Sequence, residues 1–102
     1  MTRKIIFTQR AESDLNSIID YIAADSPENA VEFYLELEKD VMSLADFPES
    51  GFVPRNYAIK NRKCRCLVCG NYVAIYYYDK PNETVQIRRI LHGAMLHGTI
   101  DD

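Results

Sequence analysis

Two stretches in the first half of the chain repeat their hydrophobic residues with the period of an α-helix. Between residues 9 and 24 the apolar positions are Ala11, Leu15, Ile18, Ile19, Ile22 and Ala23. Between residues 27 and 46 a second set follows the same spacing: Ala30, Tyr34, Leu37, Val41, Leu44 and Ala45. Because a 3.6-residue period places each set on one face, the pattern predicts two amphipathic helices.

The residues around these stripes indicate where the helices begin and end. Thr8 and Ser26 are of the type that caps helix N-termini, and Pro27 suits a first helical position because its missing N–H costs nothing there. Pro48 and Gly51 end the second helix. Since a turn of about two residues separates the helices, we expect them to form an antiparallel hairpin.

The remaining elements follow from alternation and from turn residues. An Ile-Ile-Phe run predicts a short strand over residues 3–8. Residues 52–61 contain Pro54 and Asn56, which predicts a loop that either continues or begins a strand near Tyr57. Three further strands, separated by Gly70-Asn71 and by residues 79–83, are predicted over Arg62–Cys69, Tyr72–Tyr78 and Thr84–Leu91.

These elements predict one α+β domain that comprises residues 1–102. Their order is β-α-α-β-β-β, and we expect the helical hairpin to pack on one face of a small antiparallel sheet and to leave the other face partly open. The chain is 47% hydrophobic and 26% charged, which is typical of a folded domain of this size. No stretch approaches the roughly 18 apolar residues of a membrane span, and the first residues are too short for a secretory signal, so we expect a cytoplasmic protein.

Charge is divided unevenly along the chain. The net charge of −3 by itself argues against a nucleic-acid-binding protein. However, residues 9–50 contain two basic and eleven acidic residues, whereas residues 51–92 contain eight basic and two acidic ones. The second half therefore predicts a basic surface on an acidic protein, and the local field of that surface governs what binds there.

Four stretches carry distinctive spacings, in order along the chain. They are Ala11-x-x-Asp14-Leu15-x-x-Ile18-x-x-Tyr21-Ile22, Leu44-x-x-Phe47-Pro48-x-x-Gly51, Arg65-x-Leu67-Val68-x-Gly70-x-Tyr72-x-x-x-Tyr76 and Ile87-x-Arg89-Ile90-Leu91-His92-Gly93. Together with the predicted element order, they resemble the RelE/ParE superfamily of bacterial toxins. The resemblance implies a toxin of a type II toxin–antitoxin pair, neutralised by an antitoxin that wraps it in a hetero-oligomer.

The superfamily implies two alternative activities, neither of which uses a cofactor. RelE-like members cut mRNA on the ribosome without a metal, whereas ParE-like members poison DNA gyrase and lack the nuclease residues. The ending Arg89-Ile90-Leu91-His92-Gly93 resembles the ParE branch, which makes a gyrase inhibitor the first hypothesis and an endoribonuclease the alternative. Ala94-Met95 stand where many relatives have an arginine. This departure leaves a third hypothesis, a degenerate toxin that only binds its antitoxin.

The cations of the basic half are the candidate site. RNA cleavage without a metal needs a base for the 2′-hydroxyl, cations for the charged phosphorane and an acid for the leaving oxygen. Lys63, Arg65, Arg88 and His92 would supply these groups, and strict alternation gives them a shared face of the sheet. The residues predicted to bind the target or the antitoxin are Arg62, Lys63, Arg65, Arg88, Arg89 and His92.

These assignments have simpler alternatives. Alternation places Arg89 with Ile87 and Leu91 on the apolar side of the sheet unless a β-bulge re-aims it. A histidine suits acid–base work, but His92, beside Gly93, is more typical of a hydrogen-bonded turn residue. The cations as a set are more typical of a solvated or antitoxin-binding surface than of a catalytic centre.

The cysteines and the strand tyrosines are interpreted as packing residues. Alternation points Cys69 away from Cys64 and Cys66, so we expect buried thiols and neither a disulfide nor a metal site. The tyrosines divide in the same way, with Tyr72, Tyr76 and Tyr78 on one face and Tyr77 on the other. We expect them to pack against the helices and not to stack on RNA bases.

The last expectation concerns the antitoxin. The hairpin and the sheet should leave an apolar groove with the basic surface beside it, and a small acidic antitoxin would fill it with an amphipathic helix or add a strand to the sheet. Charge reversal at Arg65 and Arg88 together is predicted to weaken the complex. Reversal at Glu32 and Glu36, in the acidic row of the second helix, is predicted to leave it unchanged.

Overall fold

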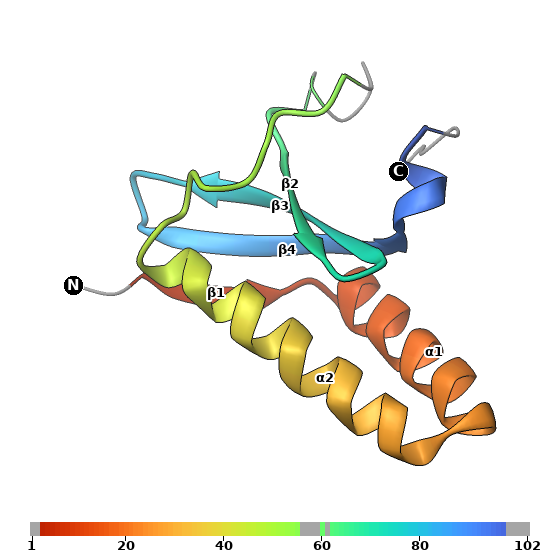
Figure 1. The fold of residues 1–102 in the computed structure, drawn as a ribbon. Helices are drawn as coiled ribbons and strands as arrows, with labels where there is room; N and C mark the ends of the chain where they lie inside the picture. Colours follow the sequence, from red (N-terminus) through yellow and green to blue (C-terminus); the bar gives the residue numbers. More distant parts are fainter. Residues whose placement is uncertain (1–2, 56–59, 61, 98–102) are drawn as a thin grey trace.

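The computed structural model describes residues 3–55, 60 and 62–97, in which two α-helices cover one face of a four-stranded sheet (Figure 1). In chain order the elements are β1 (Lys4–Phe7), α1 (Gln9–Asp25), α2 (Pro27–Met42), the 3-10 helix η1 (Ser43–Ala45), β2 (Arg65–Cys69), β3 (Tyr72–Asp79), β4 (Thr84–His92) and the 3-10 helix η2 (Gly93–His97). The predicted α+β class and the β-α-α-β-β-β order are confirmed. None of the described helices is long and apolar enough to cross a membrane.

The helical hairpin forms around the caps that the sequence indicates. The hydroxyl of Thr8 accepts a hydrogen bond from the Ala11 N–H at 3.1 Å, and the hydroxyl of Ser26 accepts one from the Asn29 N–H at 3.2 Å. Ser26 also closes the last turn of α1 with its own backbone N–H. α2 ends at Met42, earlier than predicted, because the chain tightens into η1. A side-chain cap therefore stabilises the N-terminus of each helix in the hairpin.

The sheet has the strand order β1-β4-β3-β2 and is mixed. β2, β3 and β4 are antiparallel neighbours, whereas β1 runs parallel to β4, with Lys4 opposite Thr84 and Phe7 opposite Ile87. The prediction of a wholly antiparallel sheet is wrong for this edge strand. A parallel neighbour requires a long crossover connection, and the elements between β1 and β4 provide one.

The strands follow the prediction closely except at the start of β2. Gly70, with a φ of 65°, makes the tight turn between β2 and β3. β2 begins at Arg65 and not at Arg62, because Lys63 has a φ of 60° and so leaves the extended backbone. The optional strand near Tyr57 lies outside the described residues. The basic segment before β2 is consequently a turn and not a strand.

Each face of the sheet carries an apolar cluster. Towards the helices lie the buried residues Ala11, Leu37, Val41, Leu44, Cys69, Ala74, Tyr76, Val85, Ile87 and Ile90. On the opposite face lie Cys64, Cys66, Val73, Ile75 and Leu91. The tyrosines divide as predicted, because Tyr72, Tyr76 and Tyr78 join the first cluster and Tyr77 joins the second. The larger cluster holds the helices on the sheet and so positions the site described next.

Candidate functional site

A β-bulge interrupts the pairing of β4 at its two arginines. Ile75 of β3 lies opposite Arg89, but the next pair joins Tyr76 to Ile87. Arg88 is therefore an extra residue in β4, and the alternation of side chains shifts at this point. Ile87, before the bulge, belongs to the helix-facing cluster, whereas Leu91, after it, belongs to the opposite cluster.

Arg89 points towards α1, where Asp14 binds it. Its Nε donates to Asp14 Oδ2 at 2.8 Å and its Nη2 donates to Oδ1 at 3.2 Å. The backbone N–H of Ile90 donates to the same Oδ2 at 3.0 Å. The two side chains are mostly buried, and a two-point contact between guanidinium and carboxylate is among the stronger polar contacts in proteins. Asp14 thus fastens α1 to β4 beside the bulge.

Arg88 lies on the face away from the helices. Its guanidinium stacks over the ring of Tyr77, 5.1 Å from the ring centroid, and its Nη2 donates to Gln86 Oε1 at 3.1 Å. Both contacts leave the cation half-buried at the surface. The Arg88 guanidinium is therefore accessible to a partner.

Arg65 and Tyr76 together hold the chain that follows η1. The Nη1 of Arg65 donates to the carbonyl of Gly51 at 2.9 Å and to that of Glu49 at 3.4 Å. The hydroxyl of Tyr76, which is fully buried, donates to the Pro48 carbonyl at 2.8 Å and accepts from the Gly51 N–H at 3.0 Å. Burial raises the pKa of this phenol above its ordinary value. The Arg65 guanidinium is therefore bound to two backbone carbonyls of this segment.

Gly51 packs directly against the sheet. A Cβ at this position would lie 2.6 Å from the Tyr76 hydroxyl oxygen and 2.7 Å from the Cys66 carbonyl oxygen, so no other residue fits without displacing buried atoms. The next residue, Phe52, exchanges two backbone hydrogen bonds with Cys66, at 2.9 and 2.8 Å. The segment therefore joins the edge of β2 through one bridge.

His92 and Lys63 lie at turns. The Nδ1 of His92 accepts a hydrogen bond from the Ala94 N–H at 3.1 Å, and the ring packs edge-on against Tyr72 at 5.3 Å between centroids. The expectation of a hydrogen-bonded turn at this histidine is confirmed. Lys63 is exposed in the turn before β2, where its N–H donates to the Lys60 carbonyl at 2.9 Å.

The four predicted catalytic residues do not converge. Arg65 faces the helices, Arg88 lies on the opposite face, His92 lies at the end of β4, and Lys63 shares the turn before β2 with Arg62. The prediction that alternation gathers them on one face is wrong for two physical reasons. The bulge adds a residue to β4, and the positive φ before β2 ends the alternation there.

The three cysteines are buried and divided between the two faces, as alternation predicts. Cys64 and Cys66 belong to the cluster away from the helices, and Cys69 belongs to the helix-facing cluster. Burial raises the pKa of Cys66 to about 11 and that of Cys69 to about 12. In the part of the chain that the structure describes, no three His, Cys, Asp or Glu side chains are grouped to hold a metal ion. These thiols act as small apolar core residues at neutral pH.

An apolar groove of about 500 Å³ runs between α1 and α2. Its apolar lining consists of Phe7, Leu15, Ile19, Tyr34, Leu37, Val41 and Met42, and its polar lining consists of Glu12, Asn16 and Glu38. An apolar groove is therefore present, but it lies between the two helices and acidic side chains line it, whereas the sequence predicts a groove between hairpin and sheet with basic residues beside it. The reason is that both walls come from the acidic half of the chain.

Comparison with known proteins assigns this fold to a family. Residues 5–97 match the model of the ParE toxin of the type II toxin–antitoxin system parDE. The chain belongs to the ParE toxin family. A curated relative of this ParE-family toxin is Toxin RelE2 of Caulobacter vibrioides, which is 36% identical over 93 residues, 91% of this chain and 98% of the relative. The predicted membership of the RelE/ParE superfamily is confirmed.

Two solved structures resemble the ParE-family toxin. The chromosomal ParDE toxin–antitoxin system from P. aeruginosa includes a chain with a TM-score of 0.70 and 21% identity, over 89% of this chain and 96% of that one. The toxin–antitoxin complex RelBE2 from Mycobacterium tuberculosis includes one with a TM-score of 0.57 and 26% identity, over 90% and 99%. Both share the fold of a helical hairpin on a mixed sheet.

The stretches that resemble the superfamily contain the two ties of this ParE-family toxin. Asp14 and Arg89 come from the first and last stretches, and Gly51 and Tyr76 come from the second and third. Sequence reasoning identified none of these pairings, although the residues stood in the quoted spacings. The signal was their place in the quoted spacings, with Asp14 directly before Leu15 of the apolar stripe of α1 and Gly51 as the first glycine after α2. Much of the resemblance therefore reflects residues that fix the fold.

Proposed function

We propose that this ParE-family toxin inhibits DNA gyrase in the cytoplasm by binding it, without bond-breaking chemistry of its own. The dispersal of Lys63, Arg65, Arg88 and His92 supports this proposal. Acid–base cleavage of RNA requires its groups to meet around one phosphate within hydrogen-bond reach. Here Arg65 is held by two carbonyls and Arg88 lies on the opposite face of the sheet. A binding mechanism makes no such demand on their positions.

Purified gyrase, relaxed plasmid and ATP test the proposal directly. Excess toxin should inhibit supercoiling, and addition of the cognate antitoxin should restore it. Induction of the toxin in cells without antitoxin should cause filamentation and DNA-damage signalling. Undiminished supercoiling at excess toxin rules out this target, and normal growth on induction would leave antitoxin binding as the function.

A ribosome-dependent mRNA endoribonuclease is the second candidate, favoured by the 36% identity to a relative named Toxin RelE2. Primer extension on transcripts from induced cells should then show cuts linked to codon position. Arg88→Ala and His92→Ala are suitable variants because both side chains are accessible, and Lys39→Ala on α2 is a matched control. Arg65→Ala is less suitable, since the segment after η1 would lose a tether.

A small antitoxin is the partner that the superfamily implies, and the two structural relatives come from toxin–antitoxin systems. An amphipathic helix of the antitoxin fills the groove between α1 and α2, and the rest of the antitoxin reaches the basic half around Lys63 and Arg88. Because Glu12 and Glu38 line the groove, the seated helix carries basic residues on its flanks. Toxin and antitoxin thus form a hetero-oligomer.

Binding measurements on the groove test this arrangement. Tyr34→Asp with Met42→Asp places charge on exposed positions of the lining and should weaken antitoxin binding by at least about tenfold. Tyr21→Asp, on an exposed position of α1 outside the groove, is the control. Equal affinities for the groove variant and the control would place the antitoxin elsewhere.

A further inference from the structure

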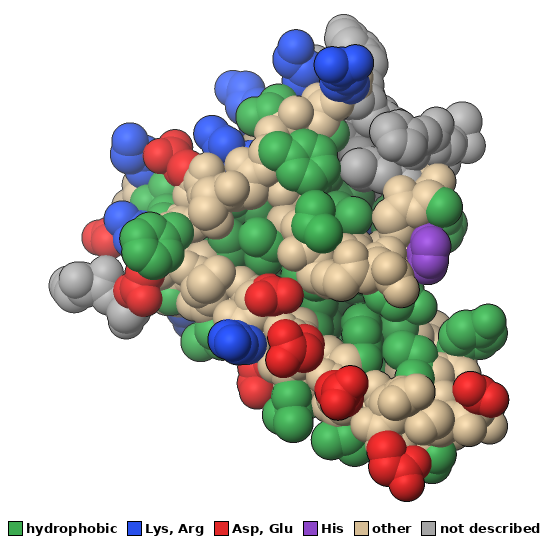
Figure 2. Space-filling view, in the orientation of Figure 1, with side chains coloured by type: hydrophobic (Ala, Val, Ile, Leu, Met, Phe, Trp, Pro, Cys, Tyr) green, Lys and Arg blue, Asp and Glu red, His purple; other side chains and the backbone are tan. Residues whose placement is uncertain are grey.

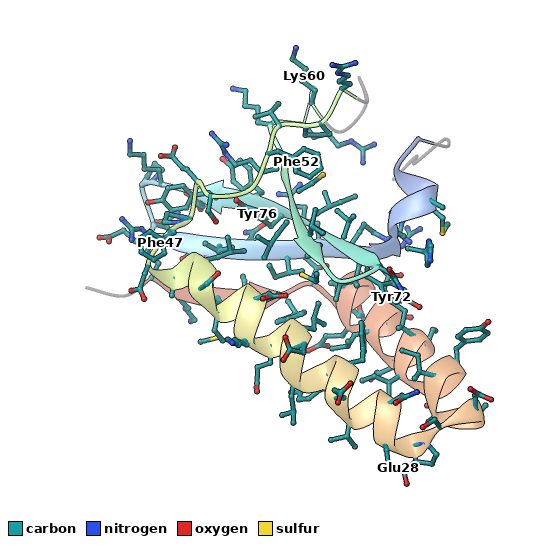
Figure 3. All side chains as sticks on the ribbon, viewed as in Figure 1. Glu28, Phe47, Phe52, Lys60, Tyr72 and Tyr76 are labelled. Atoms are coloured by element: carbon teal, nitrogen blue, oxygen red, sulfur yellow. The ribbon has the colours of Figure 1, made fainter. Side chains whose placement is uncertain are left out.

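The segment between η1 and β2 exposes large apolar side chains to water. Phe47, Phe52 and Val53 are 66%, 43% and 51% exposed. Figure 3 shows Phe47 and Phe52 on either side of Tyr76, along the same stretch of chain. Scattered apolar residues are ordinary on a protein surface, but several within seven residues of one segment are typical of an interaction site.

The backbone beneath these side chains is held in place. The Phe47 N–H donates to the Ser43 carbonyl at 3.0 Å, and the Ser50 N–H donates to the Phe47 carbonyl at 3.1 Å. Tyr76 binds the chain on both sides of Glu49, and the backbone of Phe52 pairs with β2. A surface that is already ordered loses little conformational entropy when a partner binds. The tethers therefore present the exposed phenylalanines in a fixed arrangement.

Basic residues follow this apolar segment. Arg55 and Lys60 are exposed. Figure 2 shows blue side chains gathered over this end of the molecule and red ones over α2, and Figure 3 places Lys60 and Glu28 at opposite ends. We call Phe47, Phe52, Val53, Arg55 and Lys60 the loop surface. It combines apolar anchors with positive charge and lies apart from the residues that line the groove between the helices.

We propose that the loop surface binds an acidic segment of the toxin's target protein, with large apolar side chains that cover Phe47 and Phe52. The inference rests on the proposed function only in that the toxin acts by binding a protein. Apolar anchors at the centre with charges beside them are the usual composition of a protein-binding site. A long nucleic acid fits less well, because its phosphates would continue over the acidic α2.

Two double variants test the loop surface, each with a matched control. Phe47→Ser with Phe52→Ser removes the anchors, and Val31→Ser with Leu35→Ser makes the same change at exposed positions of α2. Arg55→Glu with Lys60→Glu reverses the charges, and Lys4→Glu with Lys39→Glu is its control at exposed lysines elsewhere. Thermal unfolding verifies the fold of all four. The charge variant keeps the test valid if the serine variant unfolds.

Growth arrest on induction without antitoxin, binding to purified gyrase and binding to a labelled single-stranded oligonucleotide are the measurements. Both loop variants should no longer arrest growth and should bind gyrase at least about tenfold more weakly. The controls should match the unchanged toxin in both measurements. Loop variants as toxic as the unchanged chain overturn the inference, as does oligonucleotide binding that depends on the loop surface. If the unchanged toxin fails to bind gyrase yet its toxicity requires the loop surface, the gyrase proposal fails and this inference stands.

Discussion

Among single residues, Tyr76 makes the contacts with the clearest energetic consequence. Its buried hydroxyl serves a donor and an acceptor of the same segment, Gly51 and Pro48, with no water needed between them. Removal of a buried partner leaves backbone groups unsatisfied, which costs more than the hydrogen bond itself contributes. The position of the segment after η1 therefore depends on the hydroxyl oxygen of Tyr76.

Tyr76→Phe removes that oxygen without changing the ring. We expect the free energy of unfolding to fall by about 1–3 kcal/mol, because the Gly51 N–H and the Pro48 carbonyl lose their buried partner. Urea denaturation measures the loss, and Tyr34→Phe, at an exposed tyrosine of α2, is the control. Equal stability of the two variants would show that these backbone groups find other partners.

The buried thiols predict a decline of stability at alkaline pH. The folded pKa values of Cys66 and Cys69, about 11 and 12, lie above the ordinary 9.0. As the pH rises past about 9, the unfolded chain releases these protons first, so the free energy of unfolding falls until the folded thiols also titrate. Cys66→Ala with Cys69→Ala should flatten this decline between pH 8.5 and about 10.5, measured by urea denaturation. An unchanged slope in the double variant would assign the effect to other groups.

Among the elements, α1 and β4 are joined by a polar tie in addition to apolar packing. The carboxylate of Asp14 accepts three hydrogen bonds, two from Arg89 and one from the Ile90 backbone. All three come from the stretch beside the bulge. The direction of Arg89 is therefore a property of two elements together and not of β4 alone.

Asp14→Ala tests this tie. It should lower the free energy of unfolding by about 2–4 kcal/mol, since a mostly buried guanidinium loses its ion pair with Asp14 and the Ile90 N–H loses its acceptor. Asp20→Ala, at an exposed position of the same helix, should change stability by less than about 0.5 kcal/mol. Thermal and urea unfolding measure both. A small loss at residue 14 would mean that the apolar contacts of α1 suffice.

Local patterns explain which elements could be predicted. The helices, their caps at Thr8 and Ser26, and strands β3 and β4 follow from periodicity and turn residues within short windows. The parallel pairing of β1, the bulge at Arg88 and the turn at Lys63 depend on residues far apart in the chain or on one backbone angle. Sequence periodicity contains neither kind of information. The candidate site failed to converge for this reason, although its individual residues were identified.

Across the whole molecule, charge is separated between the two ends. Basic side chains gather where the segment before β2 lies, and acidic ones follow α2 (Figure 2). An antitoxin that spans both ends must therefore carry an acidic stretch for the basic end and a basic stretch for α2. Such a pattern favours one orientation of the partner, because the reverse orientation brings like charges together.

The antitoxin complex should consequently depend on salt in a specific way. Raising the salt concentration should slow association more than it speeds dissociation, because long-range charge acts on encounter and buried apolar contacts resist separation. Lys63→Glu with Arg88→Glu should lower the association rate. Glu32→Lys with Glu36→Lys should change it less, because neither glutamate lines the groove that the antitoxin fills. Arg65 is left unchanged because it tethers the segment after η1. Surface plasmon resonance at several salt concentrations measures both rates. A greater loss of association rate from the Glu32 and Glu36 reversal would mean that the acidic surface of α2, and not the basic half, guides the antitoxin.

The parallel pairing of β1 with β4 also sets the order in which the sheet can assemble. β2, β3 and β4 are joined by short turns and can pair as soon as they are synthesised. β1, in contrast, cannot pair until β4 has been made, because Lys4 lies opposite Thr84. During that interval the outer edge of β4 is bare and offers unpaired backbone groups to any extended strand nearby. Newly made toxin is thus most exposed to mispairing with other chains before its own first strand returns to the sheet.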